Sequence, residues 1–180
     1  MKRLVYLVLV GCSLFAATPQ GRSFFLPDPR EAASAPAKNE AVSGRVVSVA
    51  DGDTITILTE SKEQIRVRLA GIDAPEKAQA YGQKAKQALS ALVFGKEIEV
   101  TSGGKDRYGR LIGWVRCRDL AVNRQMIADG WAWHYLQYDK TPELDALQAA
   151  ARSAKRGLWA DSATPIPPWE FRSSKRSKTK

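Results

Sequence analysis

RVVSVADGDTITILTESKEQIRVRLAGIDAPE, residues 45–76, contains three segments of β-branched or alternating residues that are separated by turns. The first segment, Arg45–Ala50, ends at Asp51-Gly52, a dipeptide typical of tight hairpin turns. Thr54–Thr59 and Gln64–Leu69 continue the period-two pattern. The stretch therefore predicts a three-stranded antiparallel meander.

The hydrophobic period changes to that of a helix after this meander. Within Gly82–Phe94 the apolar residues recur at helical spacing, and Gly95 follows where such a helix would end. The expected buried stripe consists of Ala85, Ala88, Leu89, Leu92 and Val93. Two more strands are predicted beyond it, at Lys96–Thr101 and Leu111–Cys117.

Two shorter helices are predicted in the C-terminal half. Ala121–Asp129 stops at Gly130, and a third helix begins after Thr141, a candidate N-cap followed by Pro142. The buried side of the third helix would be formed by Leu144, Leu147, Ala151 and Ala154. The whole pattern predicts an α+β chain that is mainly β: a five-stranded OB-fold β-barrel with about three covering helices.

The N-terminal residues 1–17 have the composition of an export leader. Lys2-Arg3 precedes the apolar run Leu4–Ala17, which is too short to span a bilayer. Cleavage near Ala16-Ala17 is one expectation and is slightly favoured. The other is lipidation of Cys12, because Leu9-Val10-Gly11-Cys12 resembles a lipobox. The protein is expected to be exported, as a periplasmic, secreted or lipid-anchored envelope protein.

Three further parts follow the leader. Residues 18–42 are rich in Pro, Ala and Ser and are expected to form a flexible spacer, 43–160 the folded domain, and 161–180 a Pro-rich strap with a basic tail. The tail has five basic residues and no acid in its last ten positions, which is typical of a solvated segment that attracts phosphates without sequence specificity. These residues are Arg172, Lys175, Arg176, Lys178 and Lys180.

The overall composition favours a polyanionic partner and excludes several mechanisms. Lysine and arginine number 28 against 19 acidic residues, a net charge of +9 that suits nucleic acid or an anionic surface. The only histidine is His134 and the only cysteines are Cys12 and Cys117. A zinc site, a disulfide framework and two-histidine acid–base catalysis are therefore excluded. His134 is expected to be a partly exposed ring.

Acidic residues and arginines gather around the ends of the predicted strands. Asp73 and Glu76 flank Pro75, which stiffens the turn, and Asp53 lies in the preceding hairpin turn. Neighbouring carboxylates repel one another, and oxygen-only ligands suit Ca²⁺ or Mg²⁺. Arg68 and Arg110 add guanidinium groups that match phosphate oxygens. A metal, two arginines and a spare carboxylate are what phosphodiester cleavage needs.

At these residues the sequence resembles the staphylococcal nuclease (thermonuclease) family. One motif comprises Asp51-Gly52-Asp53-Thr54 and the later Arg68–Glu76, and a second is Asp106–Arg110. The resemblance extends from about Ser43 to Trp159. It implies a micrococcal-nuclease-like hydrolase, a calcium-dependent phosphodiesterase (endonuclease) that cuts DNA and RNA to products with 3′-phosphates.

The resemblance also implies a role for each matched residue. Asp53 and Asp73 would bind Ca²⁺ through carboxylates and Ala74 through its backbone carbonyl. Glu76 would act as the general base or orient the water, and Arg68 and Arg110 would hold the scissile phosphate. Arg107, Tyr108 and Tyr138 are further candidates for substrate binding, with simple packing as the alternative for Tyr108.

The sequence departs from the family pattern at three places. Ala74 stands where the staphylococcal enzyme has threonine, and the loop from Glu76 to Tyr81 is short. Leu136 occupies the position of a second nucleotide-lining tyrosine, for which Tyr135 is a candidate substitute. Trp131 and Trp133 are expected to pack in the interior.

Two other functions stay open from the sequence. One is a non-catalytic nucleic-acid-binding OB-fold module, and the other is a lipid-anchored envelope protein whose barrel only binds anions. The first alternative is weakened because the chain keeps all five residues of the acidic and arginine set. The expected partners are DNA and RNA as substrate; no protein partner is implied, and a monomer is expected.

Overall fold

The computed structural model describes residues 40–161 and 165–178. The predicted leader, with its cleavage site and Cys12, lies outside the described residues, as does most of the predicted spacer. None of the described helices combines the length and the apolar character needed to cross a membrane.

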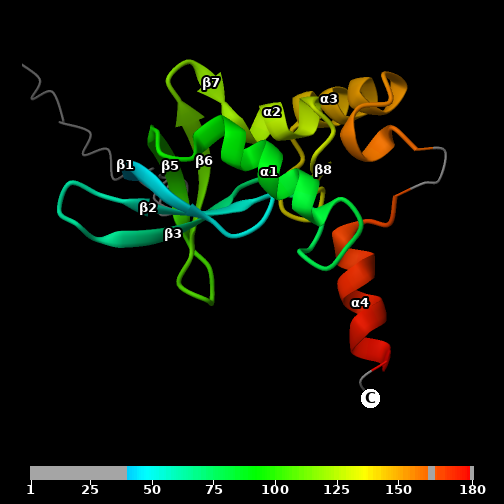
Figure 1. Ribbon diagram of the computed structural model, residues 1–180, viewed down its shortest axis with the longest axis horizontal. Helices are drawn as coiled ribbons and strands as arrows, with labels where there is room; N and C mark the ends of the chain where they lie inside the picture. Colours follow the sequence, from blue (N-terminus) through cyan, green and yellow to red (C-terminus); the bar gives the residue numbers. More distant parts are fainter. Residues whose placement is uncertain (1–39, 162–164, 179–180) are drawn as a thin grey trace, which may run out of the picture. The chain divides into compact units, whose positions relative to one another are not determined.

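Five strands form a closed barrel (Figure 1). Strands β1, β2 and β3 make an antiparallel meander, β1 also pairs with β5, and β5 pairs with β6. The parallel pairing of β3 with β6, from Val67↔Leu111 to Leu69↔Gly113, closes the circle. The strands are β1 (Glu40–Val49), β2 (Thr54–Leu58), β3 (Gln64–Leu69), β5 (Glu97–Lys105) and β6 (Leu111–Cys117). The predicted OB-fold barrel and its five strands are confirmed.

Three very short strands extend this framework. β7 (Leu120–Ala121) pairs with β6 at the edge of the barrel sheet. β4 (Ile72–Asp73) pairs with β8 (Trp133–His134), so that Asp73 lies opposite Trp133. The β4–β8 pair ties the end of the meander to the helical part of the chain and fixes the backbone that carries Asp73.

The predicted helices are confirmed within a few residues at each end. α1 (Gly82–Val93) buries Ala85, Leu89 and Val93 in the barrel core, and Gly95 follows with a positive φ of 73°. α2 (Val122–Ala128) and α3 (Pro142–Ser153) pack on each other, and a short 3₁₀ turn, η2 (Gly157–Trp159), follows. Thr141 is the residue that precedes α3, but its side chain makes no capping hydrogen bond.

A fourth helix, α4 (Pro168–Lys178), corrects the prediction of a solvated tail without structure. Pro168 stands at its first position, where a proline needs no hydrogen-bond partner for its nitrogen, and Pro168 is buried. Trp169 packs against a small cluster of Trp133, Leu158 and Trp159. The prolines before this helix are typical of an extended strap. The helix was not predicted because the aromatic contact that anchors it joins residues that are far apart in the sequence.

Two further predictions are wrong. β1 begins at Glu40, not at Arg45, because residues 40–44 pair with β5 and extend the strand into the predicted spacer. His134 is only 2% exposed and not partly exposed. Its ring nitrogens face Asp145 (2.7 Å) and Asp139 (3.2 Å), and these two carboxylates satisfy a ring that burial would otherwise leave unpaired. Trp133 is buried and Trp131 is packed against the barrel core, as predicted.

Tight packing under the β1–β2 turn generates a stability prediction. A Cβ added at Gly52 would lie 2.7 Å from Cβ of Ala74 and 2.8 Å from Cβ of Ala85. Gly52→Ala should therefore lower the free energy of unfolding by about 1–3 kcal/mol, the usual cost of an overpacked core. Urea denaturation measures the change.

Gly103→Ala is the matched control, because a Cβ there meets no described atom within 4 Å. The control should stay within about 0.5 kcal/mol of wild type, as surface substitutions usually do. Wild-type stability in Gly52→Ala would contradict the close approach of this turn to α1.

Candidate active site

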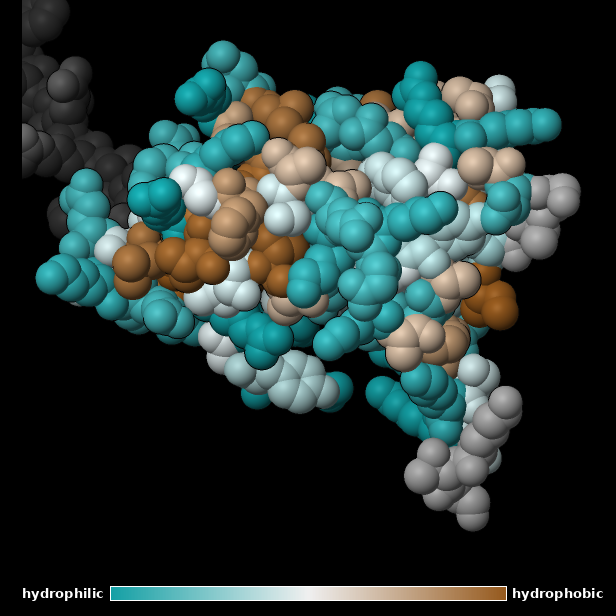
Figure 2. Space-filling view, in the orientation of Figure 1, coloured by the Kyte–Doolittle hydropathy of each residue, from teal (hydrophilic) through white to brown (hydrophobic). Residues whose placement is uncertain are grey.

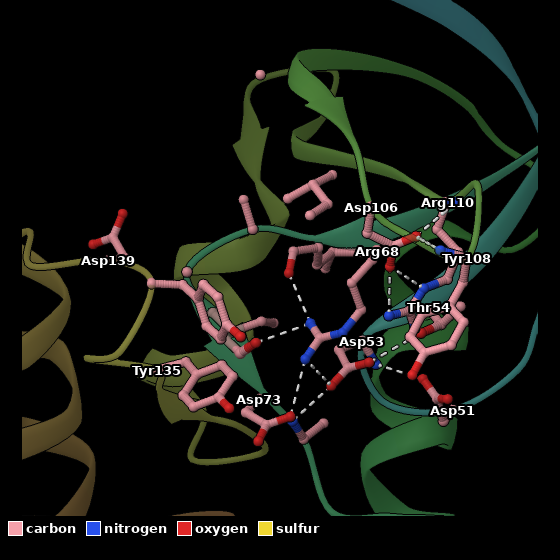
Figure 3. A pocket seen from close by; sticks show the side chains of 18 of the residues that line it. Asp51, Asp53, Thr54, Arg68, Asp73, Asp106, Tyr108, Arg110, Tyr135 and Asp139 are labelled. Carbon is pink, nitrogen blue, oxygen red and sulfur yellow. Dashed lines mark hydrogen bonds and ion pairs between the residues drawn. The ribbon is translucent and has the colours of Figure 1, made fainter. Parts of the chain in front are cut away.

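A groove of about 1000 Å³ at one end of the barrel contains every residue that the sequence marked for the site. Figure 3 shows this groove from close by. The acidic and arginine set, the Ala74 backbone and the proposed substrate-binding residues all line it, although they come from separate segments of the chain. They are Asp53, Arg68, Asp73, Ala74, Glu76, Arg107, Tyr108, Arg110 and Tyr138.

The turn between β1 and β2 places Asp53 at the base of the groove. Its side chain accepts a hydrogen bond from the backbone N–H of Ala74 (2.7 Å) and another from the Thr54 hydroxyl (3.0 Å). Asp51 accepts the N–H of Asp53 through its own carboxylate (3.1 Å), which fixes the turn. These bonds hold the carboxylate of Asp53 against the backbone of the β4 segment.

Asp73 is the most deeply buried carboxylate of the groove. It is 1% exposed and lies on β4, whose pairing with β8 fixes its backbone. The β4 strand follows Gly71, which takes a positive φ of 71° and so turns the chain from β3 into β4. Burial of a negative charge next to Asp53 is unfavourable unless positive charge compensates it.

Burial and repulsion between carboxylates raise the pKa of two acids in this cluster. Burial and the negative charge of Asp53 raise the pKa of Asp51 to about 6. Burial also raises the pKa of Asp73 above its ordinary value, although Arg172 and Arg68 both bind it, and Asp53 adds to the rise. The carboxylates therefore repel one another, and additional positive charge would stabilise their ionised forms.

Arg68 provides part of that positive charge. Its Nη2 lies 2.9 Å from Oδ1 of Asp73 and 3.1 Å from Oδ2 of Asp53. Its Nη1 donates to the carbonyls of Leu69 and Ile72. As Figure 3 shows, the guanidinium lies between the two aspartates, so it is held rigidly at the base of the groove.

The β5–β6 loop brings Arg110 to the opposite wall. Asp106 binds Nε and Nη2 of Arg110, both at 2.7 Å, and accepts the backbone N–H groups of Tyr108 and Arg110. Burial alone would raise the pKa of the Asp106 carboxyl, but these hydrogen bonds hold it below its ordinary value. The ring of Tyr108 is 69% exposed and lies beside the guanidinium groups of Arg107 (4.9 Å) and Arg110 (5.6 Å).

Glu76 lies at the mouth of the groove, with a side chain 39% exposed. Its backbone N–H donates to the side chain of Gln79, which stabilises the short loop before α1. Its carboxylate is bound by Arg172 of α4, with Oε1 2.8 Å from Nη1. The same guanidinium binds Asp73, with Nη2 2.8 Å from Oδ2. Burial alone would lower the pKa of Arg172, but the two carboxylates raise it.

Aromatic side chains form the remaining rim. Tyr138 is 74% exposed and meets Tyr135 edge to face at 4.9 Å, while Leu136 is 53% exposed. Tyr135 lines the groove, as expected of a substitute for Leu136, but its ring stacks on Trp169 at 5.5 Å with an interplanar angle of 3°. Only the ring of Tyr138 is largely exposed at this rim.

The donor set fits a hard divalent cation. The groove offers carboxylate oxygens of Asp53 and Asp73 together with the backbone of Ala74, and no sulfur or imidazole group lines it within the described chain. No group of three or more His, Cys, Asp and Glu side chains among the described residues has the arrangement of a metal site. A bound cation would thus need the Ala74 carbonyl, water or substrate oxygens to complete its shell.

Sequence reasoning missed three residues of the site. Asp51 and Asp106 appear in the sequence analysis only as parts of a turn or a motif, without a role of their own. An acid four residues before an arginine could have indicated the pairing of Asp106 with Arg110. Arg172 carried no usable signal, since it was one of several basic residues in a tail and its partners lie about a hundred positions earlier.

Comparisons with known proteins identify the family of this chain. Residues 66–161 match the protein family described as staphylococcal nuclease homologue. A protein of Escherichia coli O157:H7 named uncharacterized endonuclease is 48% identical over 135 residues, which cover 74% of this chain and 87% of that protein. A Haemophilus influenzae protein with the same description is 46% identical over 128 residues, 71% of each chain.

A plant protein is similar over a shorter part of its length. The probable staphylococcal-like nuclease CAN1 of Oryza sativa subsp. japonica is 47% identical over 117 residues, 65% of this chain and 35% of that protein. The fold and the matches define a nuclease-type OB-fold hydrolase. The chain belongs to the staphylococcal nuclease family, and the resemblance of its motifs is confirmed.

Asp106 gives a prediction with a defined pH dependence. Asp106→Asn removes the charge that holds Arg110 and should cost about 1–2 kcal/mol of stability at neutral pH, as charged hydrogen bonds do. Because the folded pKa of Asp106 is lowered, its contribution is present above the unfolded pKa of about 3.9 and is lost as the pH falls through the folded value.

Urea denaturation of wild type and Asp106→Asn between neutral and acidic pH measures this difference. The two stability curves should converge at the acidic end. A gap that is constant or widens towards low pH would show that the Asp106 carboxylate does not stabilise the loop by its charge.

Proposed function

We propose that this chain is a calcium-dependent phosphodiesterase that cuts DNA and RNA internally and leaves 3′-phosphates. The observation that carries the proposal is the convergence of Asp53, Asp73 and Glu76 with two arginines on one groove. Each group has a use in phosphodiester hydrolysis, and the family membership of the chain agrees with that reaction.

Each of these residues would have a separate role in the reaction. Arg68 is braced between Asp53 and Asp73, and Arg110 is braced by Asp106, so both positive charges are fixed in the groove where they would attract a phosphate. A calcium ion held by Asp53, Asp73 and the Ala74 carbonyl would supply further positive charge for the phosphate. Tyr138, which is exposed at the rim, offers a ring face on which a base can stack.

Glu76 would act on the attacking water. It accepts a proton as the water oxygen bonds to phosphorus, and the bond from phosphorus to the 5′-oxygen breaks. The phosphate then stays on the 3′-oxygen of the first product, and the departing 5′-oxygen takes up a proton. The carboxylate of Glu76 is more exposed than that of Asp73, which suits a group that must meet water.

Export from the cytoplasm is part of the proposal. Its support is the charged and then apolar order of residues 1–17. Lipidation at Cys12 is the alternative form of the exported protein. Mass spectrometry of the mature protein distinguishes the two, since lipidation adds acyl chains and cleavage near Ala16-Ala17 removes Cys12.

The calcium requirement is tested directly on nucleic acid. Purified protein should shorten single-stranded DNA and RNA in calcium, much more slowly in magnesium, and not in excess chelator, because a loose oxygen shell suits calcium. Asp73→Asn is the control for a contaminating nuclease. Full cleavage in chelator would contradict the metal dependence, and retention of DNA without shortening would support a binding module instead.

Substitution of Glu76 tests the assignment of the base. Glu76→Gln should reduce kcat by roughly two to four orders of magnitude, the usual contribution of a positioned general base. The thermal midpoint should change little, because the side chain is 39% exposed. A kcat within tenfold of wild type would show that another group activates the water.

A further inference from the structure

The C-terminal helix α4 places a guanidinium on two of the carboxylates assigned above to metal binding and water activation. Arg172 binds both oxygens of Asp73, with Nη2–Oδ2 at 2.8 Å and Nη1–Oδ1 at 3.3 Å. Its Nη1 also donates to Oε1 of Glu76 at 2.8 Å. The positive charge thus bridges the most buried carboxylate of the groove and the candidate base.

Aromatic and polar contacts hold the start of α4 in this position. The Trp169 ring stacks on Tyr135 and meets Trp133 edge to face at 6.5 Å. Just before the helix, the carbonyl of Ile166 accepts a hydrogen bond of 2.6 Å from Gln79, which lies in the loop after Glu76. The helix is therefore attached to the groove by its first turn and the segment before it.

Beyond Arg172, the described part of α4 is solvent-exposed. Residues 173–177 are exposed, and the visible surface of the helix is largely hydrophilic (Figure 2). The Arg172 side chain is 34% exposed, so water reaches its bond with Glu76. An attachment through one turn and the two ion pairs of one partly exposed guanidinium can open without unfolding the barrel.

We propose that α4 is an autoinhibitory element, in which Arg172 and a divalent cation bind Asp73 alternately and docked Arg172 also occupies Glu76, the candidate base. Arg172 uses both oxygens of Asp73 and occupies Glu76, so calcium binding and water activation both require it to leave. Trp169 covers the ring of Tyr135 in the same groove, so the docked helix also blocks an aromatic surface for a base. This inference rests on the proposed function, because it assigns the carboxylates to a metal ion.

The measurement is the calcium affinity of the full chain by isothermal titration calorimetry. Arg172→Gln should lower the Kd for calcium by about tenfold or more, because a competing docked state reduces the population that can bind. Trp169→Ala should tighten binding in the same direction, since it weakens the docking of α4 without touching a carboxylate. Arg176→Gln is the matched control.

Arg176 suits this control because it lies on the next turn of α4 and also lines the groove. In the described part of the chain it is not a partner of Asp73 or Glu76. Its substitution removes the same charge from the same helix and should change the calcium Kd by less than about threefold, the effect of screened charge alone.

Hydrogen exchange follows the helix itself. Amides of residues 169–178 should exchange faster in calcium than in chelator, because the cation releases the docked helix. The barrel strands should not share that increase. Unchanged exchange in α4 would overturn the proposal, since Arg172 would then keep its place while calcium binds.

The calorimetric outcomes separate this inference from the proposed function. Equal calcium affinity in wild type and Arg172→Gln would overturn autoinhibition and leave the metal site intact. Equal tightening by Arg172→Gln and Arg176→Gln would also overturn it, because only net charge would matter. No calcium binding in wild type, Arg172→Gln or Trp169→Ala would overturn both the inference and the calcium-dependent function.

Discussion

Two carboxylates buried side by side at the end of the barrel are the constraint on which the rest of the site depends. Asp73 is 1% exposed and Asp53 is 6% exposed, and Arg68 is bound between them. A buried negative pair is costly unless cations and hydrogen bonds compensate it. The β1–β2 turn, the β4–β8 pair and the packing of Gly52 against α1 all fix the positions of these two groups.

Compensation of this charge comes from two kinds of cation. Arg68 is held by four polar groups of its own neighbourhood and is a permanent part of the base of the groove. Arg172 comes from α4, which Trp169 anchors on Tyr135, and under the proposed autoinhibition its charge would be exchanged for that of a cation. Under the proposed function, the same carboxylates would serve a resting state with Arg172 bound and a metal-bound state, and the exchange between the two would be a point of control.

The barrel and most of its site could be predicted from the sequence because their signals are local. The alternation in Gln64–Leu69 and the helical stripe of Gly82–Val93 each follow from residues next to one another. Asp53 and Asp73 belong to a motif with fixed spacing. The partners of His134 and Arg172 could not be predicted, because composition does not show which carboxylate a buried imidazole or a guanidinium in a basic tail will meet.

The basic composition of the C-terminal tail predicted a solvated segment, whereas the structure has a helix there. Its basic residues are typical of a solvated segment, yet Trp169 supplies the apolar contact that orders the helix, and Arg172 has a buried partner. The contacts of Trp169 and Arg172 order the helix, but these two residues hardly change the average composition of the segment.

Binding of a divalent cation by the buried carboxylates is the basis of the proposed reaction. The thermal midpoint, measured against calcium concentration, tests this binding. A ligand that binds only the folded state raises the midpoint as its concentration exceeds Kd. The midpoint of wild type should rise with calcium, and that of Asp73→Asn should not. An equal rise in both proteins, or none in wild type, would contradict the account.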